Sequence, residues 1–307
     1  MLRHRLSLYE ALETACAEQG RRILSPWRSM LLISKATERL SQSERRWQRA
    51  PQSEAEVRQL LSRLCASGDI EAVEGARDLY RLRSPFSRST PVEEYELIME
   101  LNPFAAIAYA SALEFHNLTD QFSNALHCIV PAEPRIAGYP VGTNASDWKY
   151  FRVTRGRMPV ELGHKPVSWH RVKAEFWLGV EEYSPNGYPV RVTSIERTLL
   201  DGLRYPTLCG GFETALKAFV FAADQVSVNK IIEIAEGLNI AVLRQRTGYV
   251  LDRLGIEFEA RDRWKASSKR GGSSKLCPDL PFAPAYSEDW NLSVNYPVES
   301  IEGWPGR

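Results

Sequence analysis

The sequence predicts an α+β protein of two domains: a small helical domain ending in a hairpin, then a larger mixed domain with a central sheet and a helical C-terminal half. Three observations predict it. Helical periodicity followed by a hairpin pattern occupies the first 82 residues, short segments rich in aromatic and β-branched residues occupy the middle, and helical periodicity returns at residue 193. A chain of 307 residues, 44% of them apolar, is long enough to bury two separate cores.

Three helices are predicted before residue 68, at Leu8–Gln19, roughly Trp27–Leu40 and 53–66. The hydroxyl of Ser53 can cap the third helix, and Glu56 three residues later can complete a capping box. The apolar stripe of this helix consists of Val57, Leu60, Leu61 and Leu64. One buried face therefore leaves the opposite face of the same helix to the solvent.

A two-stranded hairpin is predicted next, with short apolar runs on either side of a turn at 74–78. The order helix, helix, helix, hairpin is typical of a winged helix-turn-helix domain, whose third helix lies in the major groove of DNA while the hairpin rests on the neighbouring backbone. We assign residues 1–88 to this domain and residues 89–307 to the second, with the Ser- and Pro-rich stretch Ser84–Pro91 as the linker.

The predicted solvent face of the third helix and the loops around it carry side chains suited to DNA. Arginine and glutamine can bond base edges bidentately, and arginines in loops suit phosphates. Glu54 and Glu56 repel phosphate, so they must point away from DNA if this interpretation holds, and docking of a protein by the same domain stays open. The predicted DNA-binding residues are Arg45, Arg46, Arg49, Ser53, Arg58, Gln59, Ser62, Arg63 and Arg77.

Charge is distributed unevenly along the chain although the net charge is only +1. Residues 1–90 hold 16 Lys and Arg against 11 Asp and Glu, an excess of +5, and residues 91–307 hold 23 against 27, which gives −4. The direction of the asymmetry favours contact between the first domain and a polyanion. The alternative, that arginine serves only as a good helix former on solvated faces, stays open on charge alone.

The second domain is predicted to begin with a buried helix and to continue as a sheet. Asn102 and Pro103 provide an N-cap and a favoured first residue for a helix rich in small side chains, which ends in capping or turn residues at His116 and Asn117. A sheet of four or more strands should follow. The strands are predicted at Leu126–Val130, Trp148–Val153, Ala174–Val180 and Tyr188–Val192.

Helices are predicted from residue 193 onward. Thr193 with Glu196 makes a second capping box, Arg197 and Asp201 lie four residues apart on one face, and Tyr205-Pro206 ends this helix. Further helices are predicted at 212–223, 228–237 and 240–254, after the Gly210-Gly211 break and up to Gly255.

Several strings in fixed order carry a family resemblance. They are YASALEFHNLTDQ at 109–121, TSIERTLLDGLRYPTLCGG at 193–211, RTGYVLDRLG at 246–255 and RGGSSKL at 270–276, all downstream of the predicted winged helix. In this order the chain resembles the AbiEi family of antitoxins and transcriptional regulators. The resemblance implies a bacterial protein that binds operator DNA to repress its own operon and counteracts a nucleotidyltransferase-like toxin of the AbiEii type in abortive infection.

The resemblance carries over to specific residues only in part. Region 25–52 is longer and more polar than expected before a recognition helix, so the DNA contacts transfer only as helix 53–66 and the hairpin. RGGSSKL and the lysine before it can provide a basic antitoxin surface through Lys269, Arg270 and Lys275, although a plain solvated loop is at least an equal alternative. A regulator of the same build without a toxin partner is the second interpretation of the whole chain.

A metal-dependent nuclease is the third interpretation, and the sequence argues against it. Asp279 could begin an Asp…Glu-x-Lys arrangement, but no lysine follows Lys275. The five histidines include no HExxH, no GxSxG elbow is present, and five scattered cysteines include no CxxC pair. We therefore predict a non-enzymatic protein with no catalytic residue, metal or cofactor.

No apolar run reaches the roughly 18 residues that a membrane-spanning helix needs, and the N-terminus has charges spaced through it. We expect a cytoplasmic protein that has no membrane partner.

Overall fold

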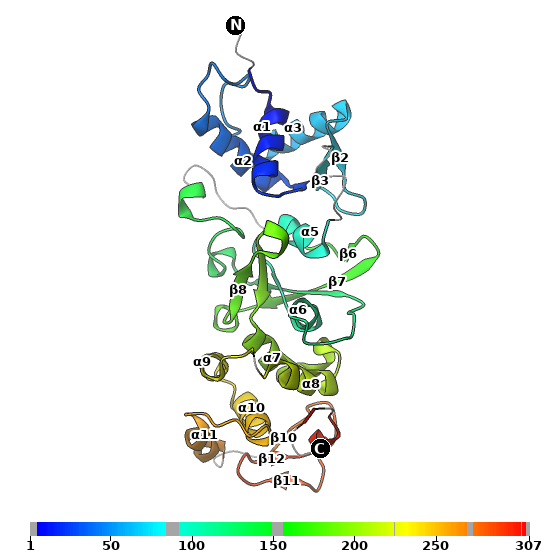
Figure 1. Ribbon diagram of the computed structural model, residues 1–307, viewed down its shortest axis with the longest axis vertical. Helices are drawn as coiled ribbons and strands as arrows, with labels where there is room; N and C mark the ends of the chain where they lie inside the picture. The colour runs from blue at the N-terminus through cyan, green and yellow to red at the C-terminus, as the bar shows by residue number, and fades with distance from the viewer. Residues whose placement is uncertain are drawn as a thin grey trace. The chain divides into compact units, whose positions relative to one another are not determined.

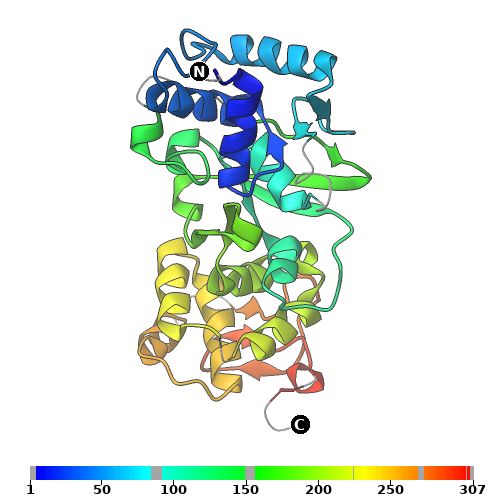
Figure 2. The same ribbon diagram turned by 45° about the horizontal axis from the view of Figure 1, so that its top comes forward.

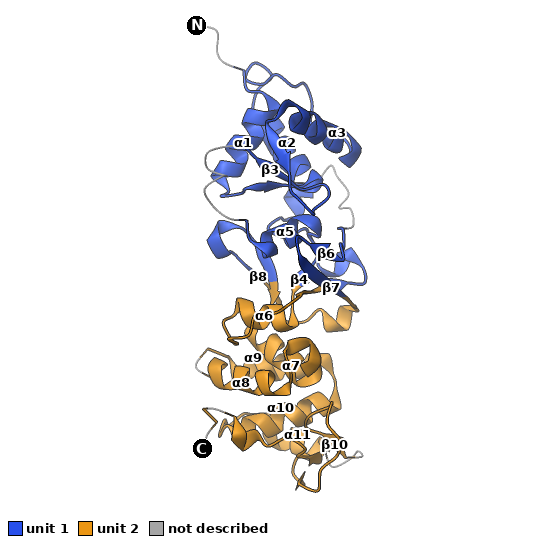
Figure 3. Ribbon diagram, turned by 90° about the vertical axis from the view of Figure 1, so that its right-hand side faces the viewer, with its two compact units in different colours: residues 1–106, 130–169, 182–191 blue, residues 107–129, 170–181, 192–307 orange. Residues whose placement is uncertain are grey.

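The computed structural model has a mixed α+β fold, as predicted, and describes residues 5–83, 92–148, 156–223, 225–268, 273–301 and 303–304. The chain forms two compact units (Figure 3). The first comprises residues 1–106, 130–169 and 182–191, and the second comprises residues 107–129, 170–181 and 192–307. The predicted linker Ser84–Pro91 lies outside the described residues, so the boundary between residues 88 and 89 stays a prediction.

The predicted helices and hairpin of the first 82 residues are present (Figure 1). They are α1 (Leu8–Glu18), α2 (Pro26–Arg39), α3 (Glu54–Ser67), β2 (Ile70–Ala72) and β3 (Tyr80–Leu82). A strand that the sequence did not predict, β1 (Ile23–Leu24), extends the hairpin to an antiparallel sheet of order β1-β3-β2. The core of this region draws on all three of these helices and consists of Leu12, Ala15, Cys16, Leu24, Met30, Leu32, Ile33, Val57, Leu61, Ile70 and Leu82.

The ends of α3 follow local backbone chemistry. Ser53 Oγ accepts the backbone N–H of Glu56 at 3.3 Å, as predicted for an N-cap. The Glu56 carboxylate accepts the N–H of Gln52 instead of that of Ser53, so the predicted capping box is only half formed. Gly68 ends the helix in the left-handed region at φ 83°, which a side chain would strain.

The predicted sheet has six strands, in the order β6-β7-β5-β4-β9-β8. The strands are β4 (Ala106–Ile107), β5 (Leu126–Pro131), β6 (Glu161–Leu162), β7 (Lys165–Val172), β8 (Val180–Tyr183) and β9 (Val190–Thr193). The predictions at 126–130 and 188–192 are confirmed to within two residues. The strand predicted at Ala174–Val180 is wrong, because Ala174–Phe176 form a 3-10 turn between β7 and β8. Of the strand predicted at Trp148–Val153, only Trp148 is described, and it ends a 3-10 turn (Ala145–Trp148). Residues 149–155 lie outside the described residues, so the rest of this strand stays a prediction.

Asn102 does not begin a helix, which corrects the prediction for this segment. It ends α5 (Glu94–Leu101), and its Oδ1 accepts the N–H of Phe104 at 3.2 Å. This local turn competes with helix formation, and Ile107 then pairs in parallel with Val192. The helix α6 starts only at Tyr109 and ends at Phe115. The predicted close packing does hold, since the small residues Ala105, Ala106, Ala108 and Ala112 are fully buried.

The helical half begins with α7 (Ile195–Arg204). Its N-cap is Ser194, whose Oγ accepts the N–H of Arg197 at 3.3 Å. The predicted Thr193–Glu196 capping box is therefore wrong by one residue, because the Thr193 hydroxyl lies 2.8 Å from that of Thr198 and the Glu196 carboxylate accepts the N–H of Ser227.

The predicted helices beyond Gly211 are confirmed to within two residues at each end. They are α8 (Phe212–Ala222), α9 (Val228–Leu238) and α10 (Ala241–Arg253), and α11 (Arg261–Ser268) follows. Figure 2 shows these helices, coloured from yellow-green to orange, together with a small sheet of order β10-β12-β11. Its strands are β10 (Ser274–Lys275), β11 (Tyr286–Ser287) and β12 (Leu292–Ser293). No helix in the described part of the chain is long and apolar enough to cross a membrane.

Candidate functional site

The exposed face of α3 presents the four side chains that the sequence predicts for it. Arg58, Gln59, Ser62 and Arg63 are all exposed, whereas Val57 and Leu61 on the other face are fully buried. The hairpin β2–β3 follows this helix directly, and Arg77 in its turn is exposed as well. We name the surface formed by these five exposed residues the α3 face.

Arg58 is held in place by carboxylates of the same unit. Its guanidinium pairs with Glu54 at 2.8 Å and with Asp78 at 3.3 Å, and Asp78 also pairs with Arg157. The sequence pattern marks Glu54 as an obstacle to phosphate, but it does not indicate Asp78 and Arg157, which lie 20 and 99 residues from Arg58 in sequence. These ion pairs orient Arg58 and partly neutralise its charge, so Arg63 is the more independent cation of the α3 face.

The loop before α3 divides the three predicted arginines. Arg45 is buried and its guanidinium donates to the carbonyl oxygens of Leu40, Trp47 and Gln48. It holds the loop together and is not placed to contact a phosphate, which removes it from the surface that the sequence predicted. Arg46 is exposed, although its Nε donates to the carbonyl of Arg5. Arg49 is exposed and pairs with Glu56 at 3.2 Å.

The predicted basic surface near the C-terminus is described only at one residue. Lys275 lies in β10, half-buried, with its Nζ 6.0 Å from the centroid of the Phe282 ring. Lys269 and Arg270 lie outside the described residues. The antitoxin surface therefore stays a prediction.

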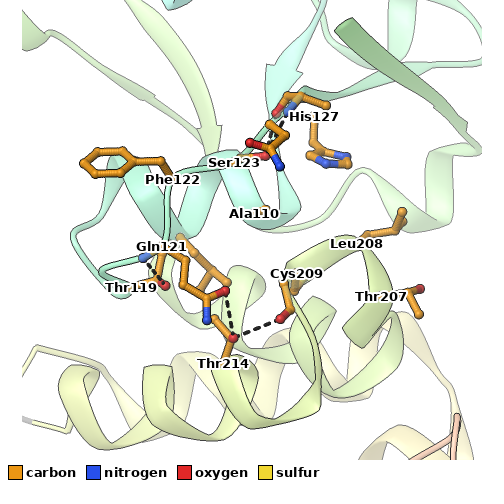
Figure 4. A pocket seen from close by; sticks show the side chains of 14 residues that line it. Ala110, Thr119, Gln121, Phe122, Ser123, His127, Thr207, Leu208, Cys209 and Thr214 are labelled. Atoms are coloured by element: carbon orange, nitrogen blue, oxygen red, sulfur yellow. Dashed lines mark hydrogen bonds between the residues drawn. The ribbon is translucent and has the colours of Figure 1, made fainter. Parts of the chain in front are cut away.

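The two strings at 109–121 and 193–211 meet in the second unit, around a cavity of about 290 Å³ (Figure 4). Thr119 and residues 121–125 line one side, and residues 207–210 with Thr214 line the other. The Thr214 hydroxyl lies 3.0 Å from the carbonyl oxygen of Gly210 and 3.4 Å from Gln121 Oε1. The lining is uncharged apart from any charge on His127 and mixes polar with apolar side chains, and its titratable residues are His127 and Cys209.

Neither string brings together the groups of a hydrolytic or metal centre. Among the described residues, no group of three or more His, Cys, Asp or Glu side chains could hold a metal ion. Burial raises the pKa of the Cys209 thiol well above its usual value, which keeps the thiol protonated and poorly nucleophilic.

Three half-buried histidines of the second unit make the stability of the protein sensitive to acid. Burial lowers the pKa of His116, His127 and His170 below the usual 6.5, and His127 and His170 stack with ring centroids 6.1 Å apart. The folded state holds them neutral while the unfolded chain takes up protons at higher pH. The contribution of these three histidines to the free energy of unfolding should therefore be fully present above pH 6.5 and be lost as the pH drops below that value.

We expect scanning calorimetry to show a lower Tm at pH 5.5 than at pH 7.5. Each kcal/mol of stability lost corresponds to a fall of about 2–4 °C for a unit of this size. His127→Gln should reduce this loss, because the Nδ1 of His127 is buried without a hydrogen-bond partner and must be desolvated when charged. A variant whose Tm falls as steeply as that of the wild type contradicts the assignment to His127.

Comparison with known proteins supports the fold. No protein-family model matches the sequence, and no curated protein matches it. Among solved structures, the chain is similar to the crystal structure of the RV2827C protein from Mycobacterium tuberculosis, with a TM-score of 0.51 and 13% sequence identity over 95% of this chain and 92% of that chain. At this level of identity the likeness extends to the arrangement of the elements along nearly the whole chain, and to nothing finer.

Proposed function

We propose that this protein is a bacterial antitoxin that binds operator DNA through its first 88 residues as a winged helix, and represses its own operon. The observation that carries the DNA-binding part is the α3 face, where Arg63 and Gln59 are exposed beside a hairpin whose turn exposes Arg77. Side chains of this kind on a helix that enters the major groove can bond base edges, while a hairpin arginine binds phosphate.

The antitoxin part rests on the sequence resemblance to the AbiEi family. It assigns to the second region, residues 89–307, the task of countering a nucleotidyltransferase-like toxin of the AbiEii type. We propose that the protein acts in the cytoplasm by binding, without a catalytic centre or cofactor of its own.

Arg63→Ala in the full-length protein is expected to weaken binding to the promoter fragment of its own operon by about 10- to 100-fold, since one good arginine–base contact is worth about 1–3 kcal/mol. Arg77→Ala should instead weaken binding to all duplexes alike and lower the salt slope by about one. Fluorescence anisotropy between 50 and 200 mM salt separates the two effects. Arg135→Ala is the matched control, because Arg135 is a highly exposed arginine of the same unit outside the α3 face. Unchanged binding in both variants would remove the α3 face from the proposal.

The antitoxin role is tested by growth. Coexpression with the neighbouring toxin gene should restore growth that the toxin alone arrests. The Arg63→Ala variant should still neutralise the toxin, because we assign repression to residues 1–88 and neutralisation to residues 89–307. If no toxin gene is adjacent, or if coexpression leaves growth arrested, the protein is a regulator without a toxin partner.

A further inference from the structure

A second cavity in the second unit differs in character from the one lined by the family strings. It measures about 360 Å³ and lies between the end of β7 and the end of α7. Its lining includes His170, Arg171, Lys173, Phe176, Arg204 and Tyr205. None of the described residues that line it is an aspartate or glutamate. We name it the cationic pocket.

Three of its cations are available to a ligand. Arg171 and Lys173 are exposed, and no ion pair engages them or Arg204 among the described residues. A fourth cation, Arg197, is neutralised by Asp201. Three positive charges without a carboxylate in the same lining favour an anion. The buried Asp201 carboxylate also acts on Arg204, but its ion pair is with Arg197.

Aromatic rings fix the position of Arg204. Its guanidinium lies 4.6 Å from the ring centroid of Phe176 and 4.6 Å from that of Tyr205. An arginine held over two rings loses little side-chain freedom when it binds a ligand, so its donors are pre-organised. The same rings give the pocket flat apolar surface beside its charges.

Tyr109 adds an unusual backbone at the pocket. This buried residue has φ +55°, in the left-handed region that a bulky side chain rarely adopts. Its ring is held edge-on by His170, at a centroid distance of 4.9 Å, and by Tyr205, at 6.0 Å. Such conformations persist where the surroundings over-determine them, and they concentrate at binding sites. The strained backbone therefore places one more aromatic ring in the wall of the pocket.

We propose that the cationic pocket binds a nucleotide, with its phosphates against Arg171, Lys173 and Arg204 and its base against the rings of Phe176 and Tyr205. The volume is in the range of small-ligand sites, and the combination of cations with aromatic rings matches the two halves of a nucleotide. Free nucleotides and the 5′-phosphorylated end of an oligonucleotide share this chemistry. The site is independent of the proposed operator contacts on the α3 face.

The test is isothermal titration of the full-length protein with GDP, ADP, CDP and UDP, and with guanosine and inorganic phosphate as partial probes. We expect saturable binding of at least one diphosphate, at least tenfold tighter than that of inorganic phosphate or guanosine. The double variant Arg171→Gln/Lys173→Gln changes only exposed side chains and should weaken binding at least tenfold, since each bond to a charged group is worth about 1.5–3 kcal/mol. Arg263→Gln, an exposed arginine of α11 in the same unit, should bind as the wild type does.

Three outcomes overturn the proposal: no saturable binding of any diphosphate at millimolar concentration, equal binding of inorganic phosphate and the diphosphates, or a double variant that binds as tightly as the wild type. Titration with a 5′-phosphorylated dinucleotide and with its unphosphorylated form distinguishes the sources. Tighter binding of the phosphorylated dinucleotide than of the free diphosphates identifies an oligonucleotide end as the ligand, and the reverse identifies a free nucleotide. Equal saturable binding of both dinucleotides is a fourth outcome that overturns the proposal, because it contradicts recognition of the phosphate.

Discussion

Glu100→Ala is expected to destabilise the protein by about 3–5 kcal/mol, because it removes the shared partner of two buried arginines. Glu100 Oε1 accepts from Arg21 at 3.1 Å and from Arg28 Nε at 2.9 Å, and Oε2 accepts from the Ser25 hydroxyl. The side chains of Glu100 and Arg28 are 1% and 2% exposed. Burial lowers the pKa of Arg28 to about 10 even with Glu100 present, so a guanidinium without that carboxylate is costly at neutral pH.

Urea denaturation followed by circular dichroism measures the loss. Glu133→Ala is the control, because Glu133 pairs with Arg135 on the surface of the same unit and its removal should cost less than about 1 kcal/mol. A drop of less than about 1 kcal/mol for Glu100→Ala would mean that water reaches Arg21 and Arg28. Such a result contradicts the buried ion cluster.

The same cluster revises the charge argument made from the sequence. The +5 excess of residues 1–90 includes Arg21, Arg22 and Arg28, which are buried against Glu96 and Glu100 of α5. Arg45 is buried too. Their partners lie beyond residue 90 or are backbone carbonyls, so a count along the chain could not find them. The exposed basic character of this region is therefore smaller than the count suggests, because four of its 16 Lys and Arg residues are buried.

Prediction from sequence succeeded where local rules decide the structure. The cap at Ser53, the stop at Gly68 and the helices from residue 212 to 254 depend on side chains within a few residues of each element, and the structure has them. Prediction failed at Asn102-Pro103, where the same two residues suit either the start of a helix or a turn. Strand pairing between Ile107 and Val192, 85 residues apart, selects the turn over the helix.

The cationic pocket was invisible for the same reason. Arg171 and Lys173 form part of the string HRVK at 170–173, a mostly polar stretch without a motif that marks a ligand site. Only the fold brings Arg204 and the ring of Tyr109 to them from other elements. The helical spacing of Arg197 and Asp201, in contrast, predicted a pair on one face, and the pair is present. What the spacing could not show is that this pair is buried.

Asp201→Ala is expected to cost about 3–5 kcal/mol, as does the loss of one partner from other buried ion pairs. Asp201 Oδ1 accepts from Arg197 Nε at 3.0 Å, and the two side chains are 0% and 2% exposed. Arg197 also donates to the carbonyl oxygens of Phe176 and Leu178, which keep its guanidinium in place when Asp201 is removed. The uncompensated charge then stays buried, and the second unit bears the cost.

The double variant Arg197→Met/Asp201→Ala distinguishes the charge effect from the loss of packing. If the cost of Asp201→Ala comes from a stranded charge, removing that charge should restore at least about 1 kcal/mol, since apolar replacements of whole buried pairs are often tolerated. Urea denaturation of the two single variants and the double variant gives the coupling energy. A double variant as unstable as the sum of the single variants would instead show that the two side chains stabilise the protein independently, through packing and through the carbonyls that Arg197 binds. In that case the ion pair positions the two side chains within α7 without contributing net charge stabilisation.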